Sequence, residues 1–198
     1  ITLFSPHEVP ELYGAWGSDD FDELYRTAER KTSVSKKKVS AQTLFFDMLK
    51  ERAETGRIYI MNIDHCNSHS SFKDRIYMSN LCQEITLPTD PIQHIDGEGE
   101  IALCILSAIN VGKLSYLEDL ESLCDLAVRA LDEIIDHQKY PVKAAEVSTK
   151  ARRSLGIGYI GLAHYREKLK LSYRDKQAWK EVDELKENFQ YYLLKASN

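Results

Sequence analysis

Three side chains that could do chemistry stand at every second position of one short segment: the amide of Asn80, the thiol of Cys82 and the carboxyl of Glu84. In extended backbone, alternate side chains lie on one face, roughly 6.6 Å apart. A thiol suits hydrogen-atom or nucleophilic chemistry, a carboxylate suits proton transfer, and an amide can orient hydroxyl groups, as on a polyol such as a ribose. The pattern is short enough to arise by chance, so a buried Cys82 flanked by solvated polar residues is the competing interpretation.

Two other cysteines lie in apolar surroundings. Cys104 falls within the apolar run 101–106, and Cys124 falls on the apolar stripe of a predicted helix. Composition alone favours a small, buried packing role for each of these two thiols.

A metal site and a hydrolase are further alternatives. His65, Cys66 and His69 are possible metal ligands, but no second Cys or His pair follows at zinc spacing, so a hydrogen-bonded loop is favoured. A cysteine-dependent hydrolase, with Cys82 as nucleophile and His65 as base, stays open, although no nucleophile-elbow or protease signature surrounds Cys82.

Glycines at 156, 158 and 161 superficially match the dinucleotide-binding pattern GxGxxG. That fingerprint should follow a strand and be followed, about 20 residues later, by an acidic residue in a second strand. The downstream region here is helical and charged instead. Tight packing at a strand-to-helix turn explains the glycines better.

The first half of the chain predicts a helix, a strand and long loops. Apolar residues at spacings of three and four predict a core-facing helix over 41–53 that ends near Gly56, followed by a largely buried strand over 57–63. Residues 64–91 are rich in Asn, Ser, Asp and Pro, which predicts long loops with short extended pieces. The charged run 18–30 and the lysines at 36–38, which we interpret as a solvated turn, suggest no function.

The second half predicts one more strand and three helices. A turn over 96–99 precedes a buried strand, or the approach to one, over 100–111. A long amphipathic helix over 117–135 ends before Pro141. A Gly-rich piece at 155–158 leads into a helix through Ala163, and a terminal helix places one apolar stripe on the following residues: Trp179, Val182, Leu185, Phe189 and Tyr192. Helix, glycine turn and buried strand together predict the α/β class.

Composition restricts the kind of protein. The 198 residues are 43% apolar and 29% charged, with a net charge of −5, so the chain can build a core and has no surface suited to coating nucleic acid. The sequence contains neither a membrane span nor a secretory signal pattern, and its four cysteines need no disulfides, so we expect a cytoplasmic protein with reduced thiols. The chain begins at Ile1 and stops within a helical pattern, so we expect one domain, or part of one, from something longer.

Seven motifs resemble the ribonucleotide reductase large (alpha) subunit family. SNLCQEI at 79–85 and GEIALC at 99–104 closely resemble its active-site sequence. Five others resemble its aerobic, di-iron-dependent class I branch, in chain order: LFSPHEVP at 3–10, TGRIYI at 55–60, NIDHCN at 62–67, RRSLGIG at 152–158 and QYYLLKASN at 190–198. The resemblance covers nearly the whole chain and favours chemical roles for Cys82 and Cys104 over packing roles.

The resemblance implies a ten-stranded α/β barrel with a central finger loop, of which residues 1–198 form a helix-rich, catalytic part. The regulatory N-terminal part and the C-terminal part of the subunit would be absent. Cys82 is placed at the tip of the finger loop. The resemblance thus implies a segment of ribonucleoside-diphosphate reductase, incomplete by itself and without activity in isolation.

The same resemblance assigns roles to six residues. It implies that Cys82 becomes a transient thiyl radical that removes the ribose 3′-hydrogen of a ribonucleoside diphosphate. Glu84 would take the 3′-hydroxyl proton and Asn80 would hold the ribose hydroxyls, with Leu81 and Gln83 completing the substrate-binding segment. Cys104 would belong to the redox-active pair that reduces the 2′-carbon.

Partners are also implied. These are a di-iron tyrosyl-radical small subunit, thioredoxin or glutaredoxin as reductant, the remainder of the large subunit and a second large subunit in a homodimer. Nucleoside triphosphate effectors would bind outside this segment, and no cofactor or metal is expected on this chain. The radical-relay tyrosines and the second redox cysteine would lie elsewhere, so Tyr191 and Tyr192 are expected to pack. A non-catalytic assembly remnant is the alternative, although keeping Asn80, Cys82, Glu84 and Cys104 together favours catalysis.

Overall fold

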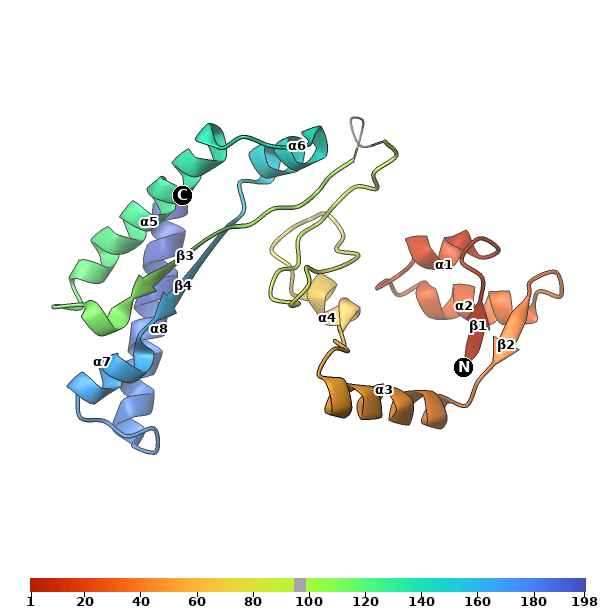
Figure 1. Cartoon of the computed structure of the whole chain (residues 1–198), viewed down its shortest axis with the longest axis horizontal. Helices are drawn as coiled ribbons and strands as arrows, with labels where there is room; N and C mark the ends of the chain where they lie inside the picture. The colour runs from red at the N-terminus through yellow and green to blue at the C-terminus, as the bar shows by residue number, and fades with distance from the viewer. Residues whose placement is uncertain (95–98) are drawn as a thin grey trace. The chain divides into compact units, whose positions relative to one another are not determined.

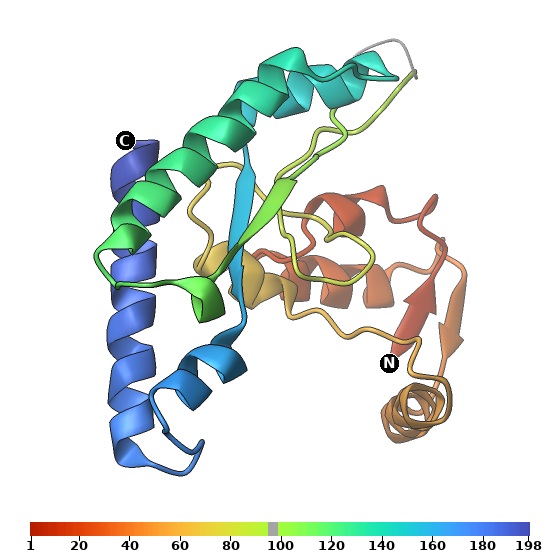
Figure 2. The same ribbon diagram turned by 60° about the vertical axis from the view of Figure 1, so that its left-hand side comes forward.

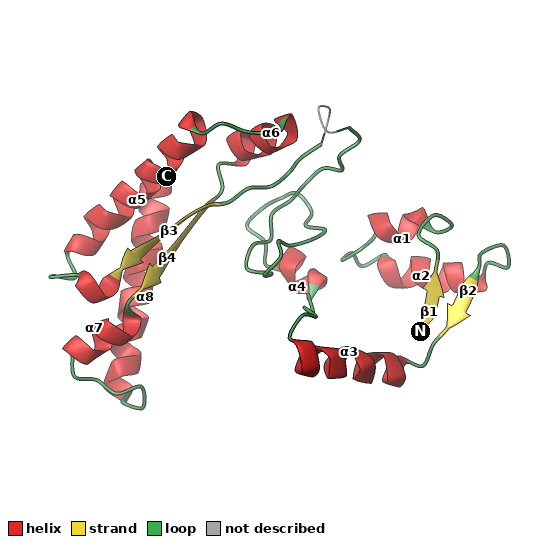
Figure 3. Ribbon diagram, in the orientation of Figure 1, coloured by secondary structure: helices red, strands yellow, loops and turns green. Residues whose placement is uncertain are grey.

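The computed structural model describes residues 1–94 and 99–198 (Figure 1), so most of the turn predicted over 96–99 lies outside the described residues. Its contacts group the chain into two compact units, Ile1–Thr89 and Asp90–Asn198. Both units mix helices with short strands (Figure 3), which agrees with the predicted α/β class. Within the described residues, no helix is long and apolar enough to cross a membrane.

The first unit is built around a short antiparallel strand pair and four helices. Its elements are β1 (Thr2–Phe4), α1 (Pro10–Gly14), α2 (Phe21–Arg30), β2 (Lys36–Lys38), α3 (Ala41–Thr55) and α4 (Ile63–Ser68). Phe4 of β1 packs against a small core of α1, α2 and their flanking residues that consists of these buried side chains: Val9, Leu12, Ala28 and Val34. The Tyr25 hydroxyl accepts the Thr2 N–H at 2.6 Å and donates to the Thr2 carbonyl at 2.8 Å, which ties α2 to β1.

Two predictions for this unit need correction. The lysines of β2 form a strand paired with β1, and not a turn, because Lys37 pairs with Leu3 in register; they are solvated, as expected. No strand forms over 57–63, because the structure offers that segment no neighbouring strand, and Tyr59 and Ile60 stay exposed.

Helix α3 has the predicted boundaries but not the predicted burial. The Ser40 hydroxyl accepts the Thr43 N–H at 3.3 Å and caps the start, and Gly56 ends the helix with φ +67°. None of its residues is buried, and Phe45, Phe46 and Leu49 are exposed. The adjacent aromatic pair spreads apolar surface around the helix, and the first unit leaves this surface exposed.

The second unit centres on a parallel strand pair. Its elements are β3 (Ile105–Asn110), η1 (Val111–Lys113), α5 (Asp119–His137), α6 (Lys143–Arg152), β4 (Leu155–Ile160), α7 (Leu162–Lys168) and α8 (Lys176–Ser197). Strands β3 and β4 run parallel with Ile105 opposite Leu155 and Asn110 opposite Ile160. Parallel neighbours need a long crossover connection, which α5 and α6 supply.

Helices α5 and α8 lie on one side of the strand pair (Figure 2) and pack against each other there. The core between these elements consists of the following buried residues: Ile109, Val111, Leu114, Leu120, Cys124, Leu185 and Phe189. Most of the predicted stripe of the long helix is buried, but Leu117 lies before α5 and Ile134 is exposed. Each fully buried Leu or Ile contributes about 1.5–3 kcal/mol. A strand forms in the predicted range 100–111 as β3, with 101–104 as its approach, but its predicted burial is wrong, because only Ile109 of β3 is buried.

The C-terminal half of the chain shows one confirmed glycine turn and one partly wrong stripe. Gly161, at φ +78°, joins β4 to α7, so the strand-to-helix turn is confirmed for this glycine, whereas Gly156 and Gly158 lie within strand β4. On α8, Leu185 and Phe189 are buried as predicted, but Trp179 is 60% exposed. The Trp179 indole lies in the first turn of α8, outside the core, and donates to the Tyr173 carbonyl at 2.9 Å.

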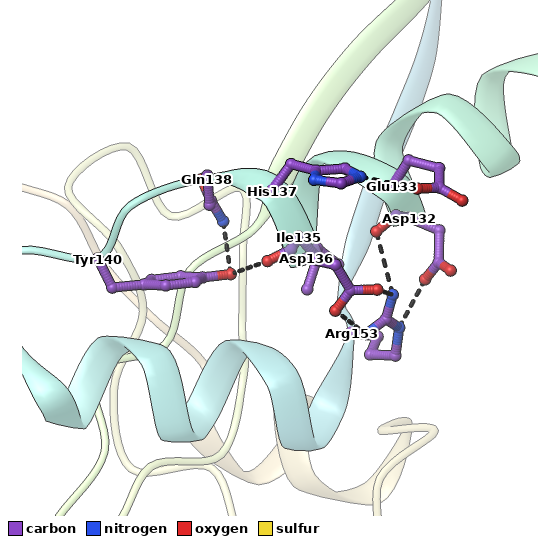
Figure 4. A network of polar contacts seen from close by, with 8 residues as sticks. All are labelled: Asp132, Glu133, Ile135, Asp136, His137, Gln138, Tyr140 and Arg153. Atoms are coloured by element: carbon purple, nitrogen blue, oxygen red, sulfur yellow. Dashed lines mark hydrogen bonds and ion pairs between the residues drawn. The ribbon is translucent and has the colours of Figure 1, made fainter.

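An ion-pair network fastens the start of β4 to α5 (Figure 4). The Arg153 guanidinium donates to Asp132 at 2.6 Å and to both carboxylate oxygens of Asp136 at 3.0 and 2.9 Å. These bonds lower the pKa of Asp136 and raise the pKa of Arg153. They also hold Arg153 in the left-handed region, at φ 46°, which is unusual for a residue other than glycine.

Candidate functional site

The segment that carries Cys82 is a loop closed on itself. The Asn80 N–H donates to the Ile85 carbonyl at 3.3 Å, and the Asn80 side-chain oxygen accepts the Ile85 N–H at 3.1 Å. Inside this clasp, the Gln83 N–H donates to the Asn80 carbonyl at 3.2 Å, and Gln83 takes φ 61°. The clasped loop, residues 80–85, therefore turns sharply at Leu81, Cys82 and Gln83.

The turn changes the geometry expected from spacing. Asn80, Cys82 and Glu84 do not line one face of an extended strand, because the backbone reverses between them. Leu81 at the tip is 91% exposed, and Cys82 and Glu84 are exposed as well. The interpretation of Cys82 as a buried residue is therefore wrong. The short loop leaves both the Cys82 thiol and the Glu84 carboxyl exposed.

The segment before the loop is fastened to the first unit by two polar side chains. The Asn67 amide donates to the Ile76 carbonyl and accepts the Ile76 N–H, each at 2.9 Å, which mimics one step of strand pairing. The Arg75 guanidinium donates to the carbonyls of Gly14 and Ala15 at 3.3 and 3.4 Å. Ile76 is almost fully buried between these anchors, so the clasped loop begins four residues beyond a fixed point.

The segment that carries Cys104 belongs to the second unit and is held differently. Backbone hydrogen bonds fix it on both sides of the cysteine: the Ile101 N–H donates to Ala144 at 3.2 Å, and the Ile105 N–H donates to Ser154 at 3.2 Å. Cys104 is half-buried at the entrance to β3. Its backbone is therefore part of the framework of the second unit.

A largely buried ion pair adds a third anchor next to Cys104. Arg152 donates to the Glu100 carboxylate at 2.7 Å, and their side chains are only 17% and 11% exposed. The same carboxylate accepts the Asp90 N–H at 3.2 Å, and the Glu100 N–H donates to the Asp90 carbonyl at 3.0 Å. Both residues belong to motifs of the family resemblance, Glu100 to GEIALC and Arg152 to RRSLGIG, and this membership is the only signal for them in the sequence.

The remaining candidates have structural explanations. Cys124 is fully buried on α5, and burial raises the pKa of its thiol to about 11, which keeps it protonated and agrees with the predicted packing role. His65, Cys66 and His69 lie on or just after the short helix α4, and not in the predicted loop. Among the described residues no group of three His, Cys, Asp or Glu side chains could hold a metal ion.

The tyrosine pair near the C-terminus has a mixed environment. Tyr192 packs against the core of the second unit, as expected, whereas Tyr191 is 58% exposed and so does not share that packing role. On a helix, adjacent residues point about 100° apart, so only one of the two can face the core.

The structure thus places the candidate residues in two local sites. Asn80, Leu81, Cys82, Gln83 and Glu84 share the clasped loop of the first unit, and Cys104 lies in the second unit. No hydrogen bond joins the Cys82 thiol to His65 among the described residues, so the geometry does not support a nucleophile and base pair of a hydrolase.

Comparisons with known proteins identify the chain's family. A family model described as "Ribonucleotide reductase, barrel domain" matches residues 1–198. The chain is 53% identical to the ribonucleoside-diphosphate reductase subunit alpha of Haemophilus influenzae and 52% identical to that of Buchnera aphidicola from Schizaphis graminum. It is 50% identical to the ribonucleoside-diphosphate reductase 1 subunit alpha of Escherichia coli. All three alignments cover 100% of this chain and 27% of the relative, so the chain spans about a quarter of their length. The chain belongs to the ribonucleotide reductase barrel-domain family.

Proposed function

We propose that the chain is the catalytic barrel segment of a class I ribonucleoside-diphosphate reductase large subunit, which reduces ribonucleoside diphosphates to deoxyribonucleoside diphosphates. The family match over all 198 residues supports this proposal. Because the chain spans about a quarter of its relatives, the activity belongs to the completed subunit. The observation that carries the proposal is Cys82, exposed at the tip of a loop that its own neighbours clasp.

The chemistry begins at Cys82. An exposed thiol on a short, closed loop can reach into a substrate site without moving the rest of the unit. As a thiyl radical, Cys82 takes the ribose 3′-hydrogen atom and leaves a carbon radical on the sugar. The clasp reduces the conformations available to the thiol, which helps to hold the sulfur at one distance from that hydrogen.

Glu84 and Asn80 act on the ribose hydroxyls. Glu84 is exposed beside Cys82 in the loop, so its carboxylate can accept the 3′-hydroxyl proton. The Asn80 side-chain oxygen already accepts the Ile85 N–H, so the amide NH₂ is the part that donates to a hydroxyl. Asn80 therefore combines a positioning role in the loop with a substrate contact, and Leu81 and Gln83 line the same site.

Cys104 supplies electrons. Replacing the 2′-hydroxyl by hydrogen releases one water and consumes two thiols, which become a disulfide. Cys104 is one of these thiols, and the second is supplied by another part of the subunit. A dithiol protein of the thioredoxin or glutaredoxin class then restores both thiols.

The fold and the partners follow from the same proposal. The parallel pair β3–β4, joined by helices, is the kind of unit from which a ten-stranded α/β barrel is built, and the clasped loop corresponds to the tip of its finger loop. The di-iron small subunit would supply the radical, a second large subunit would complete a homodimer, and nucleoside triphosphate effectors would bind outside this segment. Because the reaction needs reduced thiols, we place the enzyme in the cytoplasm.

Reconstitution tests the function. The chain is completed with the missing segments of the large subunit, covalently or as co-folding fragments, and assayed with a di-iron small subunit, a dithiol reductant and a ribonucleoside diphosphate. We expect sustained deoxynucleotide formation from the completed subunit and none from the 198-residue chain alone.

Cys82→Ser should abolish reduction in the completed subunit while leaving substrate binding intact, because a hydroxyl is nearly isosteric but does not readily form the radical. Cys66→Ser, at a half-buried thiol of α4, is the matched control and should keep its activity. Appreciable turnover by Cys82→Ser would remove Cys82 from the central role. A folded, completed subunit that assembles with its partners but never turns over would favour the non-catalytic remnant.

A further inference from the structure

The strand pair β3–β4 has two different faces. Side chains of Ile109, Ile157 and Tyr159 point into the core shared with α5 and α8. The alternate positions face the other way, where Leu106 and Ile160 are 61% and 54% exposed. Since successive side chains of a strand alternate, Cys104, two residues before Leu106, approaches β3 on this outer face.

Gly156 lies directly beneath the Cys104 sulfur on this outer face. A Cβ added at Gly156 would stand 2.9 Å from the Cys104 sulfur and 2.5 Å from Leu106 Cδ2, both too close for real atoms. Among the described glycines, those with positive φ do not include Gly156, so its backbone does not demand glycine. Glycine is needed at position 156 because the Cys104 sulfur and a Leu106 methyl group occupy the space that a Cβ would take.

The two close neighbours differ in how easily they could move. Leu106 is exposed, and its methyl group is the far end of a flexible side chain, so a rotamer change relieves that contact at small cost. Cys104 has a short side chain on a backbone held by the Ile101 and Ile105 hydrogen bonds and by the Glu100–Arg152 ion pair beside it. The sulfur can therefore yield only by leaving its rotamer, away from Gly156.

We propose that Gly156 is a positioning residue for the redox thiol. The Cys104 sulfur packs against the backbone of Gly156, which has no side chain to displace it. This contact sets the position at which the thiol meets the substrate. The proposal rests on the redox role proposed for Cys104. The contact joins β4 to the segment that leads into β3, and it does not follow from the family resemblance of segment 152–158.

Two glycines of the same strand make a matched test. Gly156→Ala adds a methyl group under the Cys104 sulfur, whereas Gly158→Ala adds one where nothing lies within 4 Å. Both variants are prepared in the full 198-residue chain. Iodoacetamide alkylation of each cysteine is followed by peptide mass spectrometry, with Cys82 in the other unit as the internal reference.

We expect the ratio of Cys104 to Cys82 alkylation rates to rise at least about threefold in Gly156→Ala, since the thiol is forced out of the position in which it rests against Gly156. In Gly158→Ala we expect the same ratio of Cys104 to Cys82 alkylation rates as in the unsubstituted chain. Equal ratios in the two variants would overturn the proposal. If Gly156→Ala disturbs folding, Leu106→Ala is added to remove the leucine contact, and this double variant is compared with Leu106→Ala alone; equal ratios there would overturn the proposal equally.

A second readout separates this proposal from the proposed function. In the completed reductase, Gly156→Ala should lower kcat with KM unchanged, because the thiol is displaced and the substrate contacts of the clasped loop are not. A raised alkylation ratio together with unchanged kcat would overturn the redox role of Cys104 and leave the positioning geometry supported.

Discussion

The two segments that carry Cys82 and Cys104 hold their thiols in opposite ways. Cys82 stands exposed on a loop that closes on itself through Asn80 and Ile85, five residues apart, so the loop could keep its form with little help from elsewhere. Cys104 stands half-buried on backbone held by residues far along the chain, such as Arg152, which bonds Glu100 across 52 positions. The radical role proposed for Cys82 suits an exposed thiol on a loop with local hydrogen bonds. The redox role proposed for Cys104, which returns the thiol to the same place after each cycle, suits a thiol held by long-range contacts.

Because the clasped loop is exposed and held by local hydrogen bonds, substitutions in it should affect chemistry and leave the stability of the fold almost unchanged. Glu84→Gln should lower turnover of the completed enzyme by about 10² to 10⁴, because an amide cannot accept the 3′-hydroxyl proton. Since Glu84 is exposed, we expect the unfolding midpoint to stay the same. Steady-state deoxynucleotide formation and urea unfolding measure the two effects.

The control for loss of a negative charge is Glu187→Gln, at an exposed carboxylate of helix α8, and it should leave turnover unchanged. Turnover by Glu84→Gln close to that of the control would show that some other group takes the proton.

The opposite pattern is expected next to Cys104. Arg152→Met leaves the largely buried Glu100 carboxylate without its cation and should lower the free energy of unfolding by about 3 kcal/mol. Lys31→Met removes an ion pair of the same 2.7 Å length with Glu11, but its side chains are 43% and 33% exposed, so we expect a much smaller loss of the free energy of unfolding. Urea unfolding of the full chain compares the two variants. Similar losses would mean that the Glu100–Arg152 pair does not anchor the Cys104 segment.

The smallest effect concerns the clasp itself. Asn80→Ala removes the acceptor of the Ile85 N–H, a hydrogen bond worth about 1 kcal/mol, and should speed hydrogen exchange of the Ile85 amide about fivefold. Asn80→Asp keeps an acceptor oxygen and should retain slow exchange while losing the amide NH₂ proposed to hold the ribose. Exchange is measured residue by residue by NMR. An Ile85 amide that exchanges equally fast in both variants would mean that the clasp does not depend on the side-chain oxygen.

Local signals explain what could be predicted of the fold. Helix α3 begins after Ser40 and ends at Gly56 because capping is a property of a few neighbouring residues, and α5 follows from its periodic apolar stripe. The strand predicted over 57–63 failed because a strand needs a partner that its own residues cannot specify. The prediction that α3 is buried was wrong for the same reason, because periodicity identifies the apolar face of a helix but not which element covers that face.

By itself, the sequence determined the chemical groups, the family and the three longest helices, α3, α5 and α8, since motifs, caps and periodicity all act over a few residues. Only the tertiary structure decided that Asn80 clasps Ile85, that Arg152 neutralises Glu100 and that Gly156 lies under the Cys104 sulfur. The last two contacts join residues about fifty positions apart, and they form only when α5 and α6 carry the chain from β3 back to a parallel neighbour. No spacing rule encodes such a contact, because it depends on strand register and on the side chains that meet across it.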